Sequence, residues 1–201
     1  MSKPFTIAVP KGYLMEETIT ILEGVGISFR DSFKDTRRLF GFDSSGQYKM
    51  LVVRPWDVPA YVSQGAADLG VAGQDVIAEQ EPNVMILRDC KFGGCKLVIA
   101  GPDQINVSEI PQHCKVVTKY PQSTERYFKK IGKKAKIIKL YGAIELGPLT
   151  GLSDFICDLT ATGATLKEHN LKIVDTVLES TAHLIANPIG MRIHYNHITN
   201  L

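Results

Sequence analysis

The segment Asp154-Phe-Ile-Cys-Asp-Leu-Thr-Ala-Thr-Gly-Ala-Thr-Leu166 carries the strongest structural signal in this sequence. A short apolar run is followed by an acidic residue, a loop of small residues and the start of a helix, which predicts a strand, a turn and a helix. Gly163 permits a positive φ or the close approach of a ligand. The hydroxyl groups of the three threonines and the N–H groups of the following helical segment favour a site for a phosphate group.

Two acidic residues belong to the same segment. Asp154 and Asp158 are expected at the strand end, where a carboxylate can orient a sugar hydroxyl or a Mg²⁺ ion held by phosphates. Ordinary helix capping also explains small residues and threonines before a helix, so the loop alone leaves both interpretations open. The order of acid, loop and Thr-Gly-x-Thr nevertheless resembles the ribose-5-phosphate loop of phosphoribosyltransferases in general.

The composition is that of a globular protein with room for one large or two small domains. The chain has 201 residues, of which 44% are hydrophobic, and a formal net charge of only +2. This charge gives no electrostatic argument for nucleic-acid binding. The first residues contain only a short apolar run, so we expect no signal peptide, no membrane span and a cytoplasmic location.

The four cysteines show no redox or zinc spacing. Cys90 and Cys95 are too far apart for a CxxC pair, and no histidine completes a metal site. Cys157 lies in an apolar run and is expected to be a small core residue. We expect all four to be reduced thiols.

Apolar runs alternate with helical patterns along most of the chain, which predicts an α/β protein with largely parallel sheets. We expect residues 173–186 to form a long strand or a pair of strands. The Gly93-Gly94 pair marks an expected crossover between domains. Strands are expected at residues 5–9, 50–54, 68–72, 84–87, 96–100, 116–118, 137–140 and 154–157. Helices are expected at residues 13–23, 59–65, 75–81, 123–131 and 145–151.

Further candidate residues follow predicted strands, where ligands gather in α/β sheets. Lys11 follows the first strand and suits a phosphate, although an exposed turn lysine explains it equally well. Arg54 can hold a phosphate with two hydrogen bonds, or it can form an ion pair with Asp57. Gly73 and Asp75 surround another turn from strand to helix, where a base or ribose can lie against the backbone.

Two basic features remain ambiguous. Arg37 and Arg38 suit contact with a polyanion in the same or a neighbouring subunit, but an ordinary surface loop is at least as good an explanation. The lysines between residues 129 and 139 are best explained as a solvated face rather than a nucleic-acid patch. No pairing among the five histidines indicates a base or a metal site.

Taken together, the chain resembles the short form of the ATP phosphoribosyltransferase family, which begins histidine biosynthesis. The match runs from about Ile7 to Asn187, and its segments occur in the family's order. They are Pro10-Lys-Gly12, Asp35-Thr-Arg-Arg-Leu39, Arg54-Pro-Trp-Asp-Val-Pro-Ala-Tyr-Val62, Gly65-Ala-Ala-Asp-Leu-Gly-Val-Ala-Gly-Gln-Asp75, Cys95-Lys-Leu97, Thr118-Lys-Tyr-Pro121, Lys139-Leu-Tyr-Gly-Ala-Ile-Glu-Leu-Gly-Pro-Leu149 and Gly151 to Leu166.

This resemblance implies a fold like that of the type II periplasmic binding proteins, with mixed, mostly parallel sheets in two lobes and a cleft between them. Lobe I would contain residues 1–91 and 179–201, and lobe II residues 92–178 with the phosphoribosyl-pyrophosphate loop. It also implies the reaction. N1 of the ATP adenine attacks C1 of 5-phosphoribosyl-1-pyrophosphate, and pyrophosphate leaves with inversion.

The resemblance further implies roles for the candidate residues. The 5-phosphate would be bound by Thr160, Ala161, Thr162, Gly163, Ala164 and Thr165. Asp158 and Asp154 would orient the ribose hydroxyls, and Glu145 would help to order the site. Lys11 and Arg54 would contact the pyrophosphate or the ATP phosphates, and Mg²⁺ would arrive with the pyrophosphate, without a metal site of the protein.

Two departures from the family pattern affect these expectations. The family usually has Arg after Lys-Gly, whereas this chain has Tyr13, which lacks the positive charge. Arg37 or Arg38 is expected to compensate. After Asn187-Pro188 the sequence offers no room for the histidine-binding domain of the long form. The short form works with a regulatory subunit resembling histidyl-tRNA synthetase, so we expect a homodimer within a hetero-oligomer.

Three other functions compete with this interpretation. A two-lobed binding protein would close on a ligand without forming a product, because the fold alone does not determine function. A nucleic-acid module would use the lysines near residues 129–139 and bind with a steep dependence on salt. A degenerate catalytic subunit would be weakened by Tyr13 and act only with its partner.

Overall fold

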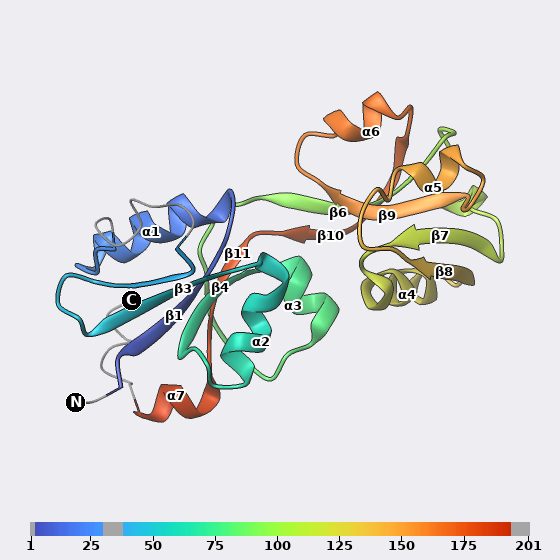
Figure 1. Ribbon diagram of the computed structural model, residues 1–201. Coiled ribbons are helices and arrows are strands. Elements are labelled where there is room, and N and C mark those ends of the chain that lie inside the picture. The colour runs from blue at the N-terminus through green and yellow to red at the C-terminus, as the bar shows by residue number, and fades with distance from the viewer. Residues whose placement is uncertain (1–2, 30–37, 194–201) are drawn as a thin grey trace. The chain divides into compact units, whose positions relative to one another are not determined.

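The computed structural model describes residues 3–29 and 38–193, which divide into two compact units (Figure 1). Lobe I contains the described residues of 1–77, 81–93 and 181–201. Lobe II contains residues 78–80 and 94–180. The chain passes from the first unit to the second at the Gly93-Gly94 pair and returns after Ser180. The boundaries expected from the sequence lay at residues 91/92 and 178/179.

The sheet of lobe I has the strand order β2-β3-β1-β4-β11-β5. Its centre is parallel, since β1 pairs in register with β3 on one side and with β4 on the other. The outer pairings are antiparallel. The strands are β1 (Phe5–Pro10), β2 (Phe40–Phe42), β3 (Tyr48–Val53), β4 (Leu69–Gly73), β5 (Met85–Asp89) and β11 (Ala182–Ala186).

Helices cover both faces of this sheet (Figure 1). Ile7 and Val9 of β1 belong to the apolar cluster that includes Leu14 and Leu22 of α1, whereas Ala8 belongs to the cluster under α2. This alternation follows from the two-residue period of a strand. The helical segments are α1 (Leu14–Gly24), a 3₁₀ turn (Pro55–Asp57), α2 (Val58–Ser63), α3 (Gln74–Gln80) and α7 (Pro188–Ile193).

The sheet of lobe II has the strand order β10-β6-β9-β7-β8. β9 is parallel to β7 and antiparallel to β6, so it lies inside the sheet with partners on both edges. Its strands are β6 (Cys95–Gly101), β7 (Cys114–Thr118), β8 (Ala135–Lys139), β9 (Phe155–Thr160) and β10 (Lys172–Ser180). Its other segments are a 3₁₀ turn (Val107–Glu109), α4 (Pro121–Lys130), α5 (Leu146–Leu149) and α6 (Ala164–Glu168).

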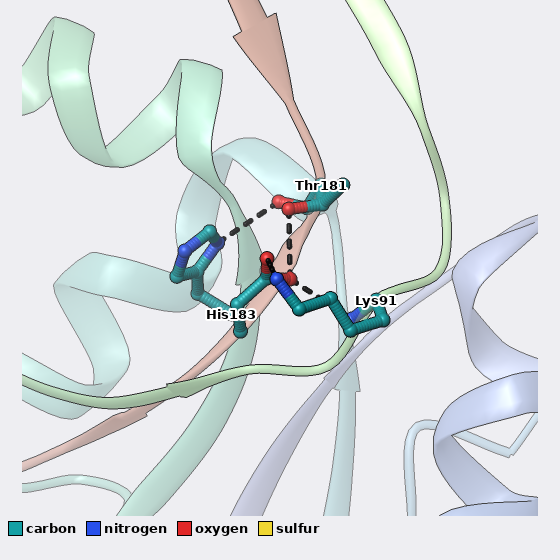
Figure 2. A network of polar contacts seen from close by, with 4 residues as sticks. Lys91, Thr181 and His183 are labelled. Carbon is teal, nitrogen blue, oxygen red and sulfur yellow. Dashed lines mark hydrogen bonds and ion pairs between the residues drawn. The ribbon is translucent and has the colours of Figure 1, made fainter.

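A polar network holds together the two segments that enter and leave lobe I (Figure 2). The Asp89 carboxylate accepts hydrogen bonds from Lys91 Nζ at 2.6 Å and from Thr181 Oγ1 at 2.8 Å. Hydrogen bonding from Lys91 holds the pKa of this carboxyl well below its usual range. His183 Nδ1 lies 3.1 Å from the Thr181 carbonyl oxygen. The end of β5 and the start of β11 are therefore joined where the chain crosses between the units.

The structure confirms the α/β class and corrects the expected strand directions. Among the described residues, four strand pairings are parallel and five are antiparallel, so the sheets are more mixed than expected. Residues 173–186 form two strands, as one of the two expectations had it: all of β10 except Lys172, and all of β11, which belong to different sheets. The short edge strand β2 was not predicted.

Gly70 of β4 is required by the close approach of α2. A Cβ atom at this position would lie 2.7 Å from Val62 Cγ2 and 2.8 Å from Val58 Cγ1, and both valines are fully buried. We expect Gly70→Ala to lower the free energy of unfolding by about 1–3 kcal/mol, because neither branched side chain can move away freely. Equilibrium unfolding in urea measures this change.

Gly24→Ala is the matched control. Gly24 is the last residue of α1, and a Cβ atom there would meet nothing within 4 Å. We expect this variant to be at least as stable as the parent, since alanine is the better helix former. Equal losses for both variants would show that tight packing at Gly70 is not the cause.

Candidate active site

The loop that the sequence predicts as a phosphate site joins β9 to α6 in lobe II. Gly163 has a φ of 78°, in the left-handed region that favours glycine. Its N–H donates to Thr160 Oγ1 at 2.9 Å, and the N–H of Ala164 donates to Thr162 Oγ1 at 3.4 Å. The two hydroxyl groups thus shape the turn. Ala161, Thr162, Ala164 and Thr165 are exposed, so the loop presents its backbone and hydroxyl groups to solvent.

α6 has only five residues, so its macrodipole contributes less than the sequence suggested. The helix is held by its apolar side. Leu166 and Leu171 are buried in a cluster with Val98, Ile144 and Ile156. This packing fixes the position of the loop relative to β9.

Asp158 is the carboxylate closest in sequence to the loop, and it lies on β9 itself. Its Oδ1 accepts a hydrogen bond from the N–H of Leu159 at 2.9 Å. Burial is the main cause that raises the pKa of the Asp158 carboxyl, and the negative charge of Glu145 raises it further. The positive charge of Lys119 acts in the opposite direction.

Three strands bring these groups to one edge of the sheet. Lys119 follows β7, and Glu145 lies in the segment after β8 at the start of α5. Because β7, β8 and β9 are parallel neighbours, their carboxyl ends meet. Sequence reasoning gave Lys119 no role, although its place directly after a predicted strand was a signal that could have found it.

Asp154 lies away from this edge. It precedes β9, and its Oδ2 accepts a hydrogen bond from the N–H of Lys115 at 2.6 Å. Its own N–H donates to the Lys115 carbonyl oxygen at 2.9 Å. Four residues of extended strand separate it from Asp158, or about 13 Å. The expectation that both carboxylates lie at the same strand end is wrong, because β9 begins after Asp154 and continues to Thr160.

A second group of predicted residues lies together in lobe I. Pro10 is paired with Val53, so Lys11 and Arg54 follow adjacent parallel strands at one edge. Gly73 ends β4 on the other side of β1, and Asp75 lies in the first turn of α3. Lys11 and Arg54 are exposed, whereas Asp75 is buried. The structure thus places two cations and a turn from strand to helix at the carboxyl edge of the parallel core.

The predicted arginine pair is only partly described. Arg37 lies outside the described residues, and Arg38 is exposed just before β2. Tyr13, at the position of the family's arginine, precedes α1 and is 65% exposed. His169, which has no role predicted from the sequence, lies near Glu145. Its Nε2 lies 3.9 Å from Glu145 Oε1.

Residues 3–29 and 38–193 contain no group of three or more His, Cys, Asp or Glu side chains arranged to hold a metal ion. Within the same residues, no helix is long and apolar enough to cross a membrane.

Comparison with solved structures defines the class of fold. The chain matches the aliphatic sulphonate binding protein SsuA of Escherichia coli with a TM-score of 0.62 at 13% identity, covering 99% of this chain and 66% of that one. A substrate binding protein of an amino acid ABC transporter matches with a TM-score of 0.57 at 14% identity. These likenesses confirm the two-lobed fold of the periplasmic binding proteins.

Closer relatives show the family. The family model for ATP phosphoribosyltransferase matches residues 54–201. An ATP phosphoribosyltransferase of Rubrobacter xylanophilus is 44% identical over 200 residues, covering 97% of this chain and 92% of that protein. The ATP phosphoribosyltransferase 2 of Geobacter sulfurreducens is 39% identical and covers 100% of this chain and 96% of that protein. The chain therefore belongs to the ATP phosphoribosyltransferase family.

A solved structure within this family also matches. It is the ATP phosphoribosyl transferase (HisG:HisZ) complex from Thermotoga maritima, with a TM-score of 0.82 at 34% identity, covering 97% of this chain and 93% of that one. The predicted resemblance, fold class and enzyme class are confirmed. None of these comparisons favours the alternative of a non-catalytic or degenerate subunit.

The raised pKa of Asp158 makes a prediction about stability. A carboxyl whose pKa is raised in the folded state is destabilising at neutral pH, and the penalty disappears as pH falls toward the ordinary value of 3.8. Asp158→Asn is therefore expected to unfold at higher urea concentration than the parent at pH 7, with a smaller difference at pH 4. Asn can still accept the bond from Leu159.

Asp103→Asn at an exposed position is the control and should leave stability unchanged at both pH values. If Asp158→Asn is less stable than the parent at pH 7, the ionised carboxylate is stabilising and the argument from burial fails.

Proposed function

We propose that this chain transfers the phosphoribosyl group of 5-phosphoribosyl-1-pyrophosphate to N1 of ATP and releases pyrophosphate, the first step of histidine biosynthesis. The observation that carries this proposal is the loop after β9, where Thr160 and Gly163 shape an exposed turn beside Asp158 in a member of this family. Cleavage of the bond to pyrophosphate builds positive charge on the ribose and negative charge on the leaving group. The enzyme must therefore hold the ribose rigidly and stabilise the pyrophosphate.

Lobe II would hold the ribose 5-phosphate. The exposed residues Thr162, Ala164 and Thr165 offer hydroxyl and N–H donors, and Gly163 allows the phosphate to approach the backbone. As an anion, Asp158 accepts hydrogen bonds from ribose hydroxyls and stabilises positive charge on the ring. Lys119 at the neighbouring strand end favours this ionised form. Glu145 helps to order the site.

Lobe I would supply positive charge for phosphates. The exposed Lys11 and Arg54 follow adjacent strands, and a guanidinium can bind two phosphate oxygens at once. Gly73 and Asp75 form a turn from strand to helix at the same edge, where a nucleotide can lie against the backbone. Arg37 and Arg38 would add charge that Tyr13 lacks.

Mg²⁺ would enter as part of the pyrophosphate substrate. Such an ion keeps several water ligands and needs only one or two carboxylates besides the phosphates. Asp158 in the second half of β9 fits this limited requirement. Bound to pyrophosphate, the ion neutralises part of the charge that the leaving group acquires.

The assembly is also part of the proposal. The Thermotoga maritima relative was solved as a HisG:HisZ complex, and this chain covers 93% of the chain it matches there. We infer a regulatory subunit of the same kind, resembling histidyl-tRNA synthetase, with the present chain as a homodimer in a cytoplasmic hetero-oligomer. Histidine would then be sensed by the partner.

A turnover assay tests the activity. ATP, phosphoribosyl pyrophosphate and Mg²⁺ are mixed with the protein and pyrophosphatase, with and without a HisZ-type subunit, and the ultraviolet absorbance of the N1-substituted adenine is followed. We expect product, with a higher rate in the presence of the subunit. Binding of phosphoribosyl pyrophosphate without product in either mixture would instead favour a non-catalytic role.

Substitution of Thr160 tests the loop. Thr160→Ala removes the acceptor for the Gly163 N–H, so the turn loses its shape and kcat/KM for phosphoribosyl pyrophosphate should fall by roughly 10²-fold. Thr20→Ala on the exposed face of α1 removes a comparable hydroxyl and should change nothing. Equal kinetics of the parent and Thr160→Ala would contradict the assignment of the loop.

Substitutions of Asp154 and Arg54 are expected to have opposite effects on stability and turnover. The role of Asp154 at the ribose stays a prediction, but its bond to the Lys115 N–H leads us to expect that Asp154→Ala, which removes this acceptor, lowers stability rather than turnover. Arg54→Gln should lower kcat/KM by roughly 10²-fold at unchanged stability, because its side chain is exposed. Urea unfolding and steady-state kinetics of the two variants distinguish these outcomes.

A further inference from the structure

A basic cavity lies in lobe II between the end of α4 and the start of β8, two elements that pack together (Figure 1). Its volume is about 610 Å³, which is within the range of sites for small molecules. Four lysines and one glutamate line it, so the lining has a formal charge of +3 with its histidine neutral. The titratable residues of the lining are Lys129, Lys133, Lys134, Lys136, Glu125 and His113.

This cavity lies at the amino ends of two parallel strands, whereas the candidate active site of lobe II lies at their carboxyl ends. His113 precedes β7 and Lys134 precedes β8, while Lys119 follows β7. β7 has five residues, so about 16 Å of extended chain separates its two ends. A ligand in the cavity would therefore not occupy the place expected for the ribose 5-phosphate.

Backbone hydrogen bonds determine the shape of the cavity wall. After α4 the chain turns at Gly132, whose φ of 70° lies in the left-handed region. The N–H of Lys133 donates to the Phe128 carbonyl oxygen at 2.9 Å, which is the longer hydrogen bond of a Schellman motif. The N–H of His113 donates to the Lys134 carbonyl oxygen at 2.8 Å and joins this turn to the segment before β7. The lysines thus extend from a backbone that is ordered without a ligand.

One of the four lysines is held in place by the protein itself. Nζ of Lys133 donates to the carbonyl oxygen of Ser108 at 2.6 Å and also to that of Ile110. Because an ammonium group has three donors, this arrangement leaves one N–H for a ligand. A ligand that bound Lys133 would not have to restrict a mobile side chain, which lowers the entropic cost of binding.

The other three lysines have no carboxylate partner in the structure. Within residues 3–29 and 38–193, the ammonium groups of Lys129, Lys134 and Lys136 form no ion pair. Lys129 lies in the last turn of α4, where a positive charge also stabilises the helix dipole, but the other two lie beyond that helix. Like charges around one cavity repel each other, and a bound polyanion would relieve this repulsion.

We propose that this cavity binds a small molecule that carries two or more adjacent phosphate groups. Adjacent phosphates can accept hydrogen bonds from lysines of α4, of the following turn and of β8 at the same time. Glu125 reduces the positive charge of the lining without cancelling it. Phe128 and Ile137 add an apolar part to the wall, against which an organic group of the ligand can pack. The inference does not depend on the proposed function.

An NMR titration of the ligand-free protein with inorganic tripolyphosphate tests the site directly. At constant ionic strength, we expect the amide signals of Gly132 and Lys134 to shift and to reach saturation. Inorganic phosphate should bind roughly tenfold more weakly, because a single phosphate contacts fewer lysines at once. The amide of Gly163 reports separately on the loop after β9. Saturable shifts at Gly163 without shifts at Gly132 would support the candidate active site and contradict a site in the cavity.

Two double variants of equal net charge test whether the lining lysines are responsible. Lys134→Gln/Lys136→Gln should raise the dissociation constant measured at the Gly132 amide by roughly tenfold. Lys115→Gln/Lys130→Gln is the matched control, since both side chains are exposed and neither lines the cavity. It should change the dissociation constant by less than about twofold. The amide spectra show at the same time whether both variants are folded.

The outcomes that overturn the inference are clear. Shifts at Gly132 that grow with tripolyphosphate without saturating would show general attraction to a basic surface. Equal weakening in both double variants would show that net charge, and not the cavity, determines binding. Turnover of the parent enzyme, or its absence, bears only on the proposed function, because the titration contains neither ATP nor phosphoribosyl pyrophosphate.

Discussion

The packing of Leu166 and Leu171 against Ile144 and Ile156 is the contact on which the site of lobe II depends. A five-residue helix such as α6 does not form in water by itself, because the unfavourable free energy of helix nucleation exceeds the favourable free energy of one turn of hydrogen bonds. Burial of the two leucines stabilises it and determines where the chain must turn. The same cluster holds the segment before α5, so three stretches distant in sequence meet beside β9.

The site residues are placed by a common rule in both lobes. Parallel strands end at one edge of a sheet, and polar residues that follow them are gathered there without any direct contact between the segments. In lobe I this rule brings Lys11 beside Arg54, and in lobe II it brings Lys119 beside Asp158. This arrangement is unfavourable for Asp158, because burial disfavours the ionised carboxylate that the proposed reaction requires. A neighbouring cation and a local N–H donor offset part of this penalty.

Much of this arrangement was accessible from the sequence, because strong periodicity and glycine positions are local signals. The loop after β9, the position of Gly163 and the edge that carries Lys11 and Arg54 followed from strands ending before turns. The direction of strand pairing could not be predicted. The apolar composition of β5, β10 and β11 does not reveal whether a neighbouring strand runs parallel or antiparallel. Asp154 was misplaced because it was grouped with Asp158, although the strand expected at residues 154–157 already separates the two carboxylates by its whole length.

The contact of His169 with Glu145 was also beyond sequence reasoning. The residues are 24 positions apart, and only the burial of their neighbours brings them together. Such contacts depend on tertiary packing and require coordinates.

The position of β11 has a consequence for how the chain acquires its structure. This strand lies between β4 and β5, yet it follows them by the whole length of lobe II. During synthesis, lobe II can complete its sheet as soon as β10 has emerged, whereas the sheet of lobe I stays interrupted until one of the last strands arrives. Insertion of β11 joins segments that are far apart along the chain. Because folding slows as contacts join residues more distant in sequence, this insertion is expected to be a slow step. Until then the facing edges of β4 and β5 are open to pairing with other chains, and lobe I is the part of the molecule most exposed to aggregation.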